Sequence, residues 1–222
     1  TLAVVPVAHL ASDRRAGTVI SGTIFGAASL EAIAGLALYV IPRDLAYRAL
    51  VALEPLGYPT GDSVIRYRPD TDILRAIGTS IDPNMLGVLL MVAGAIGIAA
   101  LLAPRPPWPR AVSALALGPT LACLLLTESR GSWLSLGAAI AVIAVLRHRR
   151  LLFVALAAAV AVPFVPAAQR FTEHLISGLQ AQDRAASMRL GEISNAVTII
   201  ASAPWVGVGW RSEEHTSELQ SH

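Results

Sequence analysis

The chain has 222 residues, of which 55% are hydrophobic and only 14% are charged. Soluble domains carry about 25% charged residues, so this composition excludes an ordinary soluble domain. It also excludes a disordered chain, which would be rich in charge and poor in aliphatic residues. The single cysteine excludes a disulfide scaffold. A net charge of +2 gives no indication of nucleic-acid binding, and a membrane protein with several spans is the remaining class.

Long apolar runs account for this composition. A helix that crosses the ~30 Å hydrocarbon core of a bilayer needs about 20 apolar residues. We expect five spans, near residues 18–41, 84–103, 111–127, 132–146 and 151–168, with residues 1–10 as the end of a sixth. Lipid offers the backbone no hydrogen bonds, so these runs must be helical. The predicted fold class is all-α, a transmembrane helix bundle.

The placement of the arginines predicts how the bundle is oriented. All 17 basic residues are arginine. The short loops at residues 12–17, 104–110 and 147–150 hold seven of them against one acid. Basic residues in short loops favour the cytoplasmic side. The two long loops, 42–83 and 170–210, and the turn at 128–130 are then extracytoplasmic.

The last twelve residues differ in character from all that precedes them. Residues 211–222 read RSEEHTSELQSH, with no apolar stripe, and resemble the translation of a sequencing-adapter read. We expect this tail to be an artefact. Residues 1–210 are then expected to be part of a longer chain, because position 1 is not Met and the native part ends inside a motif.

Glu31 lies in the middle of the first expected span. A carboxylate at the bilayer centre costs about 2.5–3.5 kcal/mol on insertion scales, so it normally faces other helices or an aqueous cavity. Two interpretations remain open, a functional site residue and a structural hydrogen bond. The second is the more common one.

Candidate residues for chemistry cluster at the extracytoplasmic ends of the spans. Asp82 followed by Pro83 is typical of a helix start. Arg75, by contrast, has no helix to cap in this interpretation. Arg130 sits in a tight turn, where its guanidinium either reaches the lipid headgroups or binds a phosphate bidentately. Trp133 is predicted to be an interface anchor.

Other polar residues give weaker signals. Cys123 is isolated within a span and is predicted to serve only packing. His174 is most simply a solvated loop residue, and Asp70 and Asp72 form one D-x-D in an acidic loop. No C-x-x-C, H-E-x-x-H or Walker motif is present. The sequence therefore predicts no metal and no cofactor.

Four features occur in a fixed order along the chain. They are R-x-x-G-T with a following P-N (Arg75, Gly78, Thr79, Pro83, Asn84), T-x-S-R-G (Thr127, Ser129, Arg130, Gly131), Arg189 at an amphipathic stretch of residues 183–202, and P-x-x-G-V-G (Pro204, Gly207, Val208, Gly209). In order, spacing and sidedness they resemble the O-antigen ligase and polysaccharide polymerase family. The resemblance covers roughly residues 18–210.

This resemblance implies a multi-spanning glycosyltransferase of the bacterial inner (plasma) membrane. Such proteins move a glycan from an undecaprenyl-diphosphate carrier to a hydroxyl of a lipid or glycan acceptor, without a metal or a nucleotide sugar. By motif position, Arg75, Arg130 and Arg189 are the candidates for contact with the diphosphate. The catalytic histidine of the ligases lies beyond P-x-x-G-V-G, so we expect it to be missing here, and His174 lies too early to be its match.

Two other classes remain open. A transporter or permease for lipid-linked glycans or solutes would need charged residues along several spans, and only Glu31 is clearly intramembrane. A non-catalytic subunit of a membrane assembly is the other alternative. Loss of glycan transfer on substitution of Arg75 or Arg189 would separate the glycosyltransferase from both.

Overall fold

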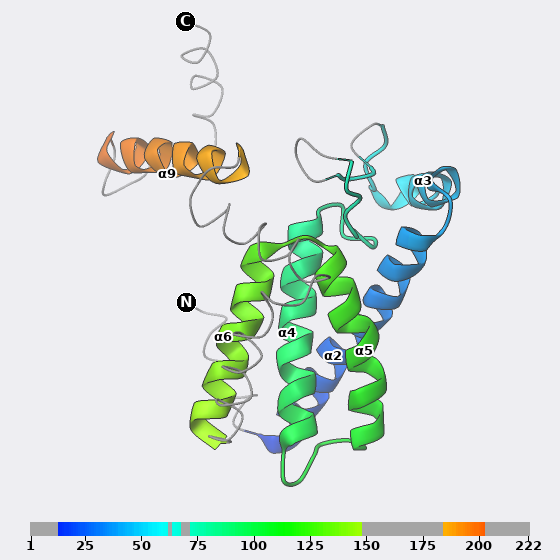
Figure 1. Cartoon of the computed structure of the whole chain (residues 1–222), viewed down its shortest axis with the longest axis vertical. Coiled ribbons are helices and arrows are strands. Elements are labelled where there is room, and N and C mark those ends of the chain that lie inside the picture. Colours follow the sequence, from blue (N-terminus) through cyan, green and yellow to red (C-terminus); the bar gives the residue numbers. More distant parts are fainter. Residues whose placement is uncertain (1–12, 62–63, 68–71, 148–183, 203–222) are drawn as a thin grey trace, which may run out of the picture. The chain divides into compact units, whose positions relative to one another are not determined.

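The computed structural model describes residues 13–61, 64–67, 72–147 and 184–202 (Figure 1). Within these residues the regular elements are helices, and one isolated β-bridge joins Tyr67 to Leu74. The all-α prediction is confirmed for this part of the chain. The chain divides into two compact units, Thr1–Val165 and Pro166–His222, which we describe separately.

Three described helices are long and apolar enough to cross a membrane. They are α2 (Arg14–Val40), α4 (Pro83–Leu102) and α6 (Arg130–Arg147). A fourth helix, α5 (Arg110–Leu126), is apolar but has only 17 residues. These helices coincide with the first four predicted spans to within a few residues. The predicted fifth span, 151–168, lies outside the described residues, as do residues 1–10.

The long loop 42–83 contains helical structure that the sequence analysis did not predict. Helix α3 (Arg43–Val51) follows α2 directly, and a short 3₁₀ helix, η1 (Glu54–Leu56), follows α3. Ala46 and Leu50 lie one turn apart on α3 and are both buried, so this helix has an inward face. Asp44 in its first turn complements the helix dipole.

Helix α4 packs against α2, α5 and α6, and small residues let these helices approach one another. A Cβ at Gly97 would lie 2.6 Å from the ring of Phe25 on α2 and 2.9 Å from Leu117 on α5. Gly94 likewise faces Leu136 on α6. One polar contact crosses the core, because the hydroxyls of Ser29 and Thr120 lie 3.3 Å apart.

Large apolar side chains point outward along the same helices. Leu30, Met85 and Leu115 are each about 70% exposed or more. Because lipid tails are as apolar as these side chains, such a surface is stable in a bilayer and costly in water. The exposed faces therefore agree with a membrane protein.

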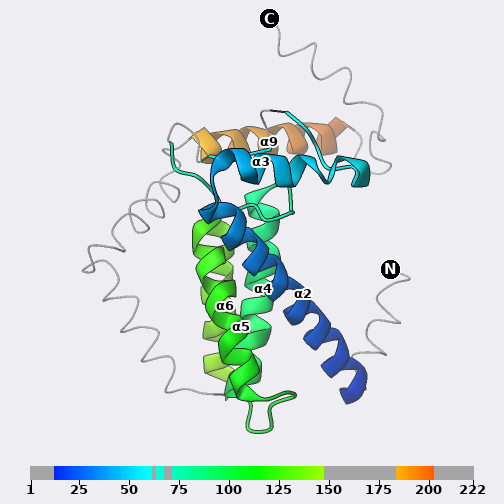
Figure 2. The same cartoon turned by 90° about the vertical axis from the view of Figure 1, so that its right-hand side faces the viewer.

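The bundle of the first unit has two unlike ends (Figures 1 and 2). One end, here called the loop end, carries α3, the described parts of residues 41–82 and the turn 127–130. The other, the short-loop end, carries residues 103–109, which join α4 to α5. The described arginines of the short loops lie at the short-loop end, in agreement with the predicted alternation of sides.

In the second unit the structure describes α9 (Arg184–Ser202). A helix over residues 183–202 was predicted from the spacing of its apolar residues, and the structure confirms it. Ile193, Val197 and Ile200 recur along it at helical spacing. Residues 203–222, with the P-x-x-G-V-G motif and the tail, lie outside the described residues.

Candidate functional site

Arg75 lies at the loop end and is held by two hydrogen bonds, one of them to a residue 52 positions away. Its Nε donates to the carbonyl oxygen of Thr127 at 2.7 Å, and its Nη2 donates to Oδ1 of Asn84 at 3.0 Å. Thr127 is the C-cap residue of α5, whose last carbonyls have no partner within the helix. The expectation that Arg75 has no helix to cap is therefore wrong. Arg75 caps the C-terminal end of α5, which lies about 50 residues later in the chain.

The segment after Arg75 is fixed by α5 on one side and by α2 on the other. The amide of Ala76 donates to the carbonyl oxygen of Leu126 at 2.8 Å. Three residues further on, the amide of Thr79 donates to Oε1 of Glu31 at 2.5 Å, and the hydroxyl of Thr79 lies 2.9 and 3.0 Å from the two carboxylate oxygens. The structural hydrogen-bond interpretation of Glu31 is thus confirmed.

Glycines allow this close approach. Gly78 has φ +56°, a left-handed conformation, and a Cβ there would collide with Oε1 of Glu31. Gly35, one turn after Glu31 on α2, packs against the backbone of Gly78. Ile81 also has a positive φ of 59°, which is strained for a β-branched residue. The segment is thus tightly formed before Asp82 starts α4.

The start of α4 explains the P-N part of the first motif. Asp82 accepts hydrogen bonds from the amides of Asn84 and Met85, so the predicted N-cap is confirmed. Pro83 occupies the first turn, where a missing N–H costs nothing. Asn84 then presents its side chain to Arg75. The arginine and the asparagine of the motif therefore form one contact.

The T-x-S-R-G turn packs onto α4. The hydroxyls of Ser129 and Ser132 lie 3.0 Å apart, and a Cβ at Gly87 would lie 2.7 Å from the Ser132 hydroxyl. Trp133 was expected to be an interface anchor. Its half-buried indole N–H donates to the carbonyl oxygen of Leu124 at 3.0 Å, and its ring packs against the core; its role as an interface anchor stays a prediction. This turn is therefore held from inside the protein.

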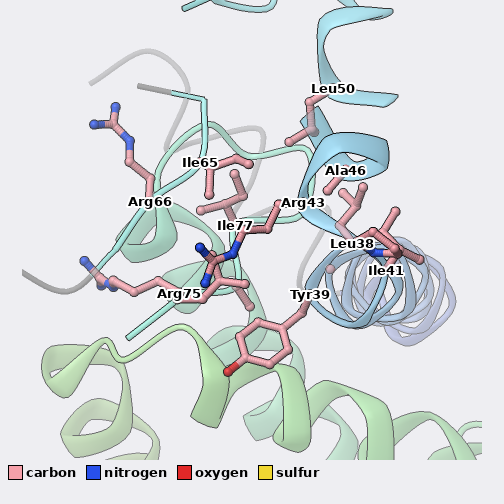
Figure 3. Close-up of a pocket in the computed structure, with 14 residues that line it drawn as sticks. Leu38, Tyr39, Ile41, Arg43, Ala46, Leu50, Ile65, Arg66, Arg75 and Ile77 are labelled. Atoms are coloured by element: carbon pink, nitrogen blue, oxygen red, sulfur yellow. The ribbon is translucent and has the colours of Figure 1, made fainter. Parts of the chain in front are cut away.

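A pocket of about 280 Å³ opens at the loop end beside Arg75 (Figure 3). One wall is apolar and comes from α2 and α3, with Leu38, Ile41, Ala46 and Leu50 among its residues. The loop supplies Ile65, Ile77 and two arginines. Figure 3 shows the guanidinium groups of Arg43, Arg66 and Arg75 on the side away from Leu38 and Leu50. The lining residues include no carboxylate.

Arg43 and Arg66 were missed by the sequence analysis. Arg43 stacks its guanidinium 5.3 Å from the ring centre of Tyr67, and Nε of Arg66 is buried without a hydrogen-bond partner. A buried N–H with no partner is costly in a native protein and calls for an explanation. Neither residue belongs to a motif, so the only available signal was their position between a span and the motif.

The same region has a second buried polar group. Tyr58 belongs to a small apolar cluster with Leu50, Val64 and Ile77, and its hydroxyl has no hydrogen-bond partner. Burial raises the pKa of Tyr58 above its ordinary value of 10.0. The phenol is therefore neutral at physiological pH, and it adds no charge beside the three arginines.

The structure places the other predicted site residues only in part. Arg130 is the first residue of α6, three residues after the carbonyl that Arg75 caps, and it is half-buried. Arg189 lies in α9, in the second unit. His174 and Asp70 lie outside the described residues. Cys123 is fully buried in the core, as predicted.

Comparison with known proteins finds a family match for the C-terminal part of the chain. A family model described as O-antigen ligase matches residues 115–221. This part of the chain is an O-antigen ligase domain. No curated protein and no solved structure matches the chain.

The O-antigen ligase match covers most of α5, all of α6 and α9, and the turn with Arg130. Glu31 and Arg75 precede the matched range, and Arg75 is connected to it by its hydrogen bond to Thr127. The match also runs to residue 221, within the tail that the sequence analysis set apart. The assignment of residues 211–222 as an artefact stays a prediction.

Proposed function

We propose that this protein is a membrane glycosyltransferase of cell-surface polysaccharide synthesis. The match of residues 115–221 to the O-antigen ligase family model supports a ligase or polymerase role in that process. In the proposed reaction, a glycan leaves an undecaprenyl-diphosphate carrier and joins a hydroxyl of a lipid or glycan acceptor. The loop end then faces the extracytoplasmic side of the bacterial inner membrane, and the five predicted spans cross it.

The observation that supports this proposal best is the arginine-lined pocket at the end of an apolar bundle. Arg43, Arg66 and Arg75 are among the residues that line a cavity whose other wall is aliphatic. A lipid diphosphate has the same two parts, an anionic head and an apolar chain. Arginine suits the head because its planar fork can donate two parallel hydrogen bonds to phosphate oxygens.

The chemistry needs stabilisation of the leaving group more than covalent catalysis. Negative charge grows on the carrier diphosphate as the glycosidic bond breaks, and fixed positive groups lower the energy of that state. We assign this contact to Arg75, Arg130 and Arg189. Arg75 is the best supported, because its hydrogen bonds to Thr127 and Asn84 fix its side chain before substrate arrives.

The test is a transfer assay with the full-length protein in proteoliposomes. Undecaprenyl-diphosphate-linked glycan and the acceptor are supplied with EDTA, and the coupled product is measured by mass spectrometry. We expect transfer, with release of undecaprenyl diphosphate and no dependence on added metal. If lipid-linked glycan crosses the bilayer but no product forms, the protein is a transporter and the proposal is wrong.

A further inference from the structure

We propose that Glu31 is a positioning residue for Arg75, which it holds through Thr79. The inference rests on the proposed function, because it gives Arg75 a role in substrate binding. It goes beyond that function, because Glu31 lies in none of the four motifs, does not line the pocket and does not bond to Arg75 itself. The carboxylate binds Thr79, and Thr79 lies four residues after Arg75 along the backbone.

Both carboxylate oxygens of Glu31 accept hydrogen bonds from Thr79. Thr79 offers both its amide and its hydroxyl, and each lies within 3.0 Å of a carboxylate oxygen. Charged acceptors form the shorter and stronger class of hydrogen bond. An apolar pair could hold α2 against the loop with less desolvation. What a carboxylate adds is a defined direction and register for the backbone at Thr79.

The fit around the carboxylate is close enough to transmit a displacement. Gly78 leaves no room for a side chain against Glu31, and Gly35 packs on the Gly78 backbone from the next turn of α2. Close-packed groups move together because there is no void to absorb a shift. Replacing Glu31 should therefore displace the backbone of residues 78–79.

The backbone between Thr79 and Arg75 is fastened at both ends. At one end, Ala76 and Arg75 donate to the carbonyls of Leu126 and Thr127 at the end of α5. At the other end, Thr79 is held by Glu31 on α2. The segment 75–79 thus bridges α5 and α2, and without Glu31 it loses its hydrogen bonds to α2 while it keeps those to α5 and to Asn84 on α4. Arg75 then keeps its chemistry but loses its fixed place in the pocket.

The experiment compares variants of the full-length protein in the transfer assay, normalised to the folded fraction by size exclusion. We expect Glu31→Ala to lower kcat/KM for the lipid-linked donor about tenfold, the loss of a charged hydrogen bond. Glu31→Gln keeps a carbonyl acceptor and should recover most of the activity. Thr79→Val removes one hydroxyl and should show a smaller loss, which Thr79→Ser restores. Glu54→Gln and Thr23→Val are the exposed controls and should leave activity unchanged.

Two further measurements separate positioning from a general structural role. The first is a double-mutant cycle, in which Glu31→Ala should add almost nothing to the loss in Arg75→Ala, because both affect the same group. The second is hydrogen exchange over residues 72–82, which Glu31→Ala should raise and Glu54→Gln should not. Losses that multiply in the double variant would overturn the inference.

These outcomes also distinguish the inference from the proposed function. If Arg75→Ala keeps full transfer, the role of Arg75 fails and the positioning of Glu31 fails with it. If Arg75→Ala abolishes transfer while Glu31→Ala and Thr79→Val change neither exchange nor kcat/KM, only the positioning of Arg75 by Glu31 is refuted. Should Glu31→Ala not fold, the pair Thr79→Val and Thr79→Ser carries the test alone.

Discussion

Among the residues that the structure describes, an arginine caps a helix end at each end of the bundle. At the short-loop end, Arg110 donates from Nε to the carbonyl oxygen of Leu101 at 3.3 Å and from Nη2 to that of Ala103 at 3.0 Å. At the loop end, Arg75 does the same for α5. Arg110 is exposed and the carbonyls that it caps lie within nine residues, whereas Arg75 is half-buried and the carbonyl that it caps lies 52 residues away.

This difference shows how the two ends acquire their structure. The short-loop end closes through local contacts that the chain can form with little loss of entropy. The loop end brings three distant segments together, and each closure of a long loop costs more entropy. Such an arrangement persists only if several contacts fix it together, as the bonds of Glu31, Arg75 and Ala76 do. A site with defined geometry is therefore expected at the loop end.

The largest expected effect comes from Gly78→Ala. A methyl group there meets the Glu31 carboxylate, and φ +56° alone costs an alanine about 1–2 kcal/mol. We expect most of the folded protein to be lost, measured as the monodisperse fraction in detergent size exclusion. The matched control is Gly118→Ala on α5, where a Cβ meets no atom within 4 Å. Similar yields for the two variants would show that the loop end is not rigid.

The comparison of the two capping arginines gives the next prediction. Arg75→Ala should lower transfer about 10²-fold, the usual effect of removing one donor to a developing negative charge. Arg110→Ala should leave transfer within about twofold, because it loses only an exposed cap worth about 1 kcal/mol. Transfer rates and thermal midpoints of both variants check this. Equal losses of transfer would assign Arg75 a capping role only.

A smaller effect is expected at Arg66. Arg66→Met keeps the volume but removes the charge and the unpartnered Nε, so the KM for the lipid-linked donor should rise several-fold while kcat changes little. Arg105→Met is the control, because Arg105 is exposed at the short-loop end. A donor titration measures both. An unchanged KM in Arg66→Met would remove the pocket from the donor site.

The smallest effect is expected at Tyr58, and it depends on pH. Because burial raises the pKa of Tyr58, the folded state keeps its proton at a pH where the unfolded chain loses it. The contribution to stability is therefore complete below pH ~10 and is lost as the pH rises through the folded pKa. Tyr58→Phe should have nearly the same midpoint as the parent protein at pH 7 and a higher one at pH 11. A parallel decline of both proteins in alkali would contradict this.

The sequence predicted the bundle better than the site. Runs of apolar residues located α2, α4, α5 and α6 to within a few residues, because span length and hydropathy are properties of local sequence. The N-cap at Asp82 was predictable for the same reason, because its partners lie two and three residues later in the chain. The Arg75–Thr127 and Glu31–Thr79 pairs are about 50 residues apart, and no periodicity encodes such pairs. Arg43 and Arg66 become candidates only when folding brings them beside Arg75.

The hydrogen bonds from the first motif to the end of α5 are accepted by main-chain carbonyl oxygens. Leu126 and Thr127 contribute only their carbonyl oxygens to Ala76 and Arg75, and any amino acid supplies that oxygen. The Arg75–Asn84 contact, in contrast, needs both side chains. Among homologues, substitutions at 75 and 84 should therefore be correlated, while position 127 should vary independently of 75. A chimera could exchange residues 72–84 as one cassette without altering the turn that receives it.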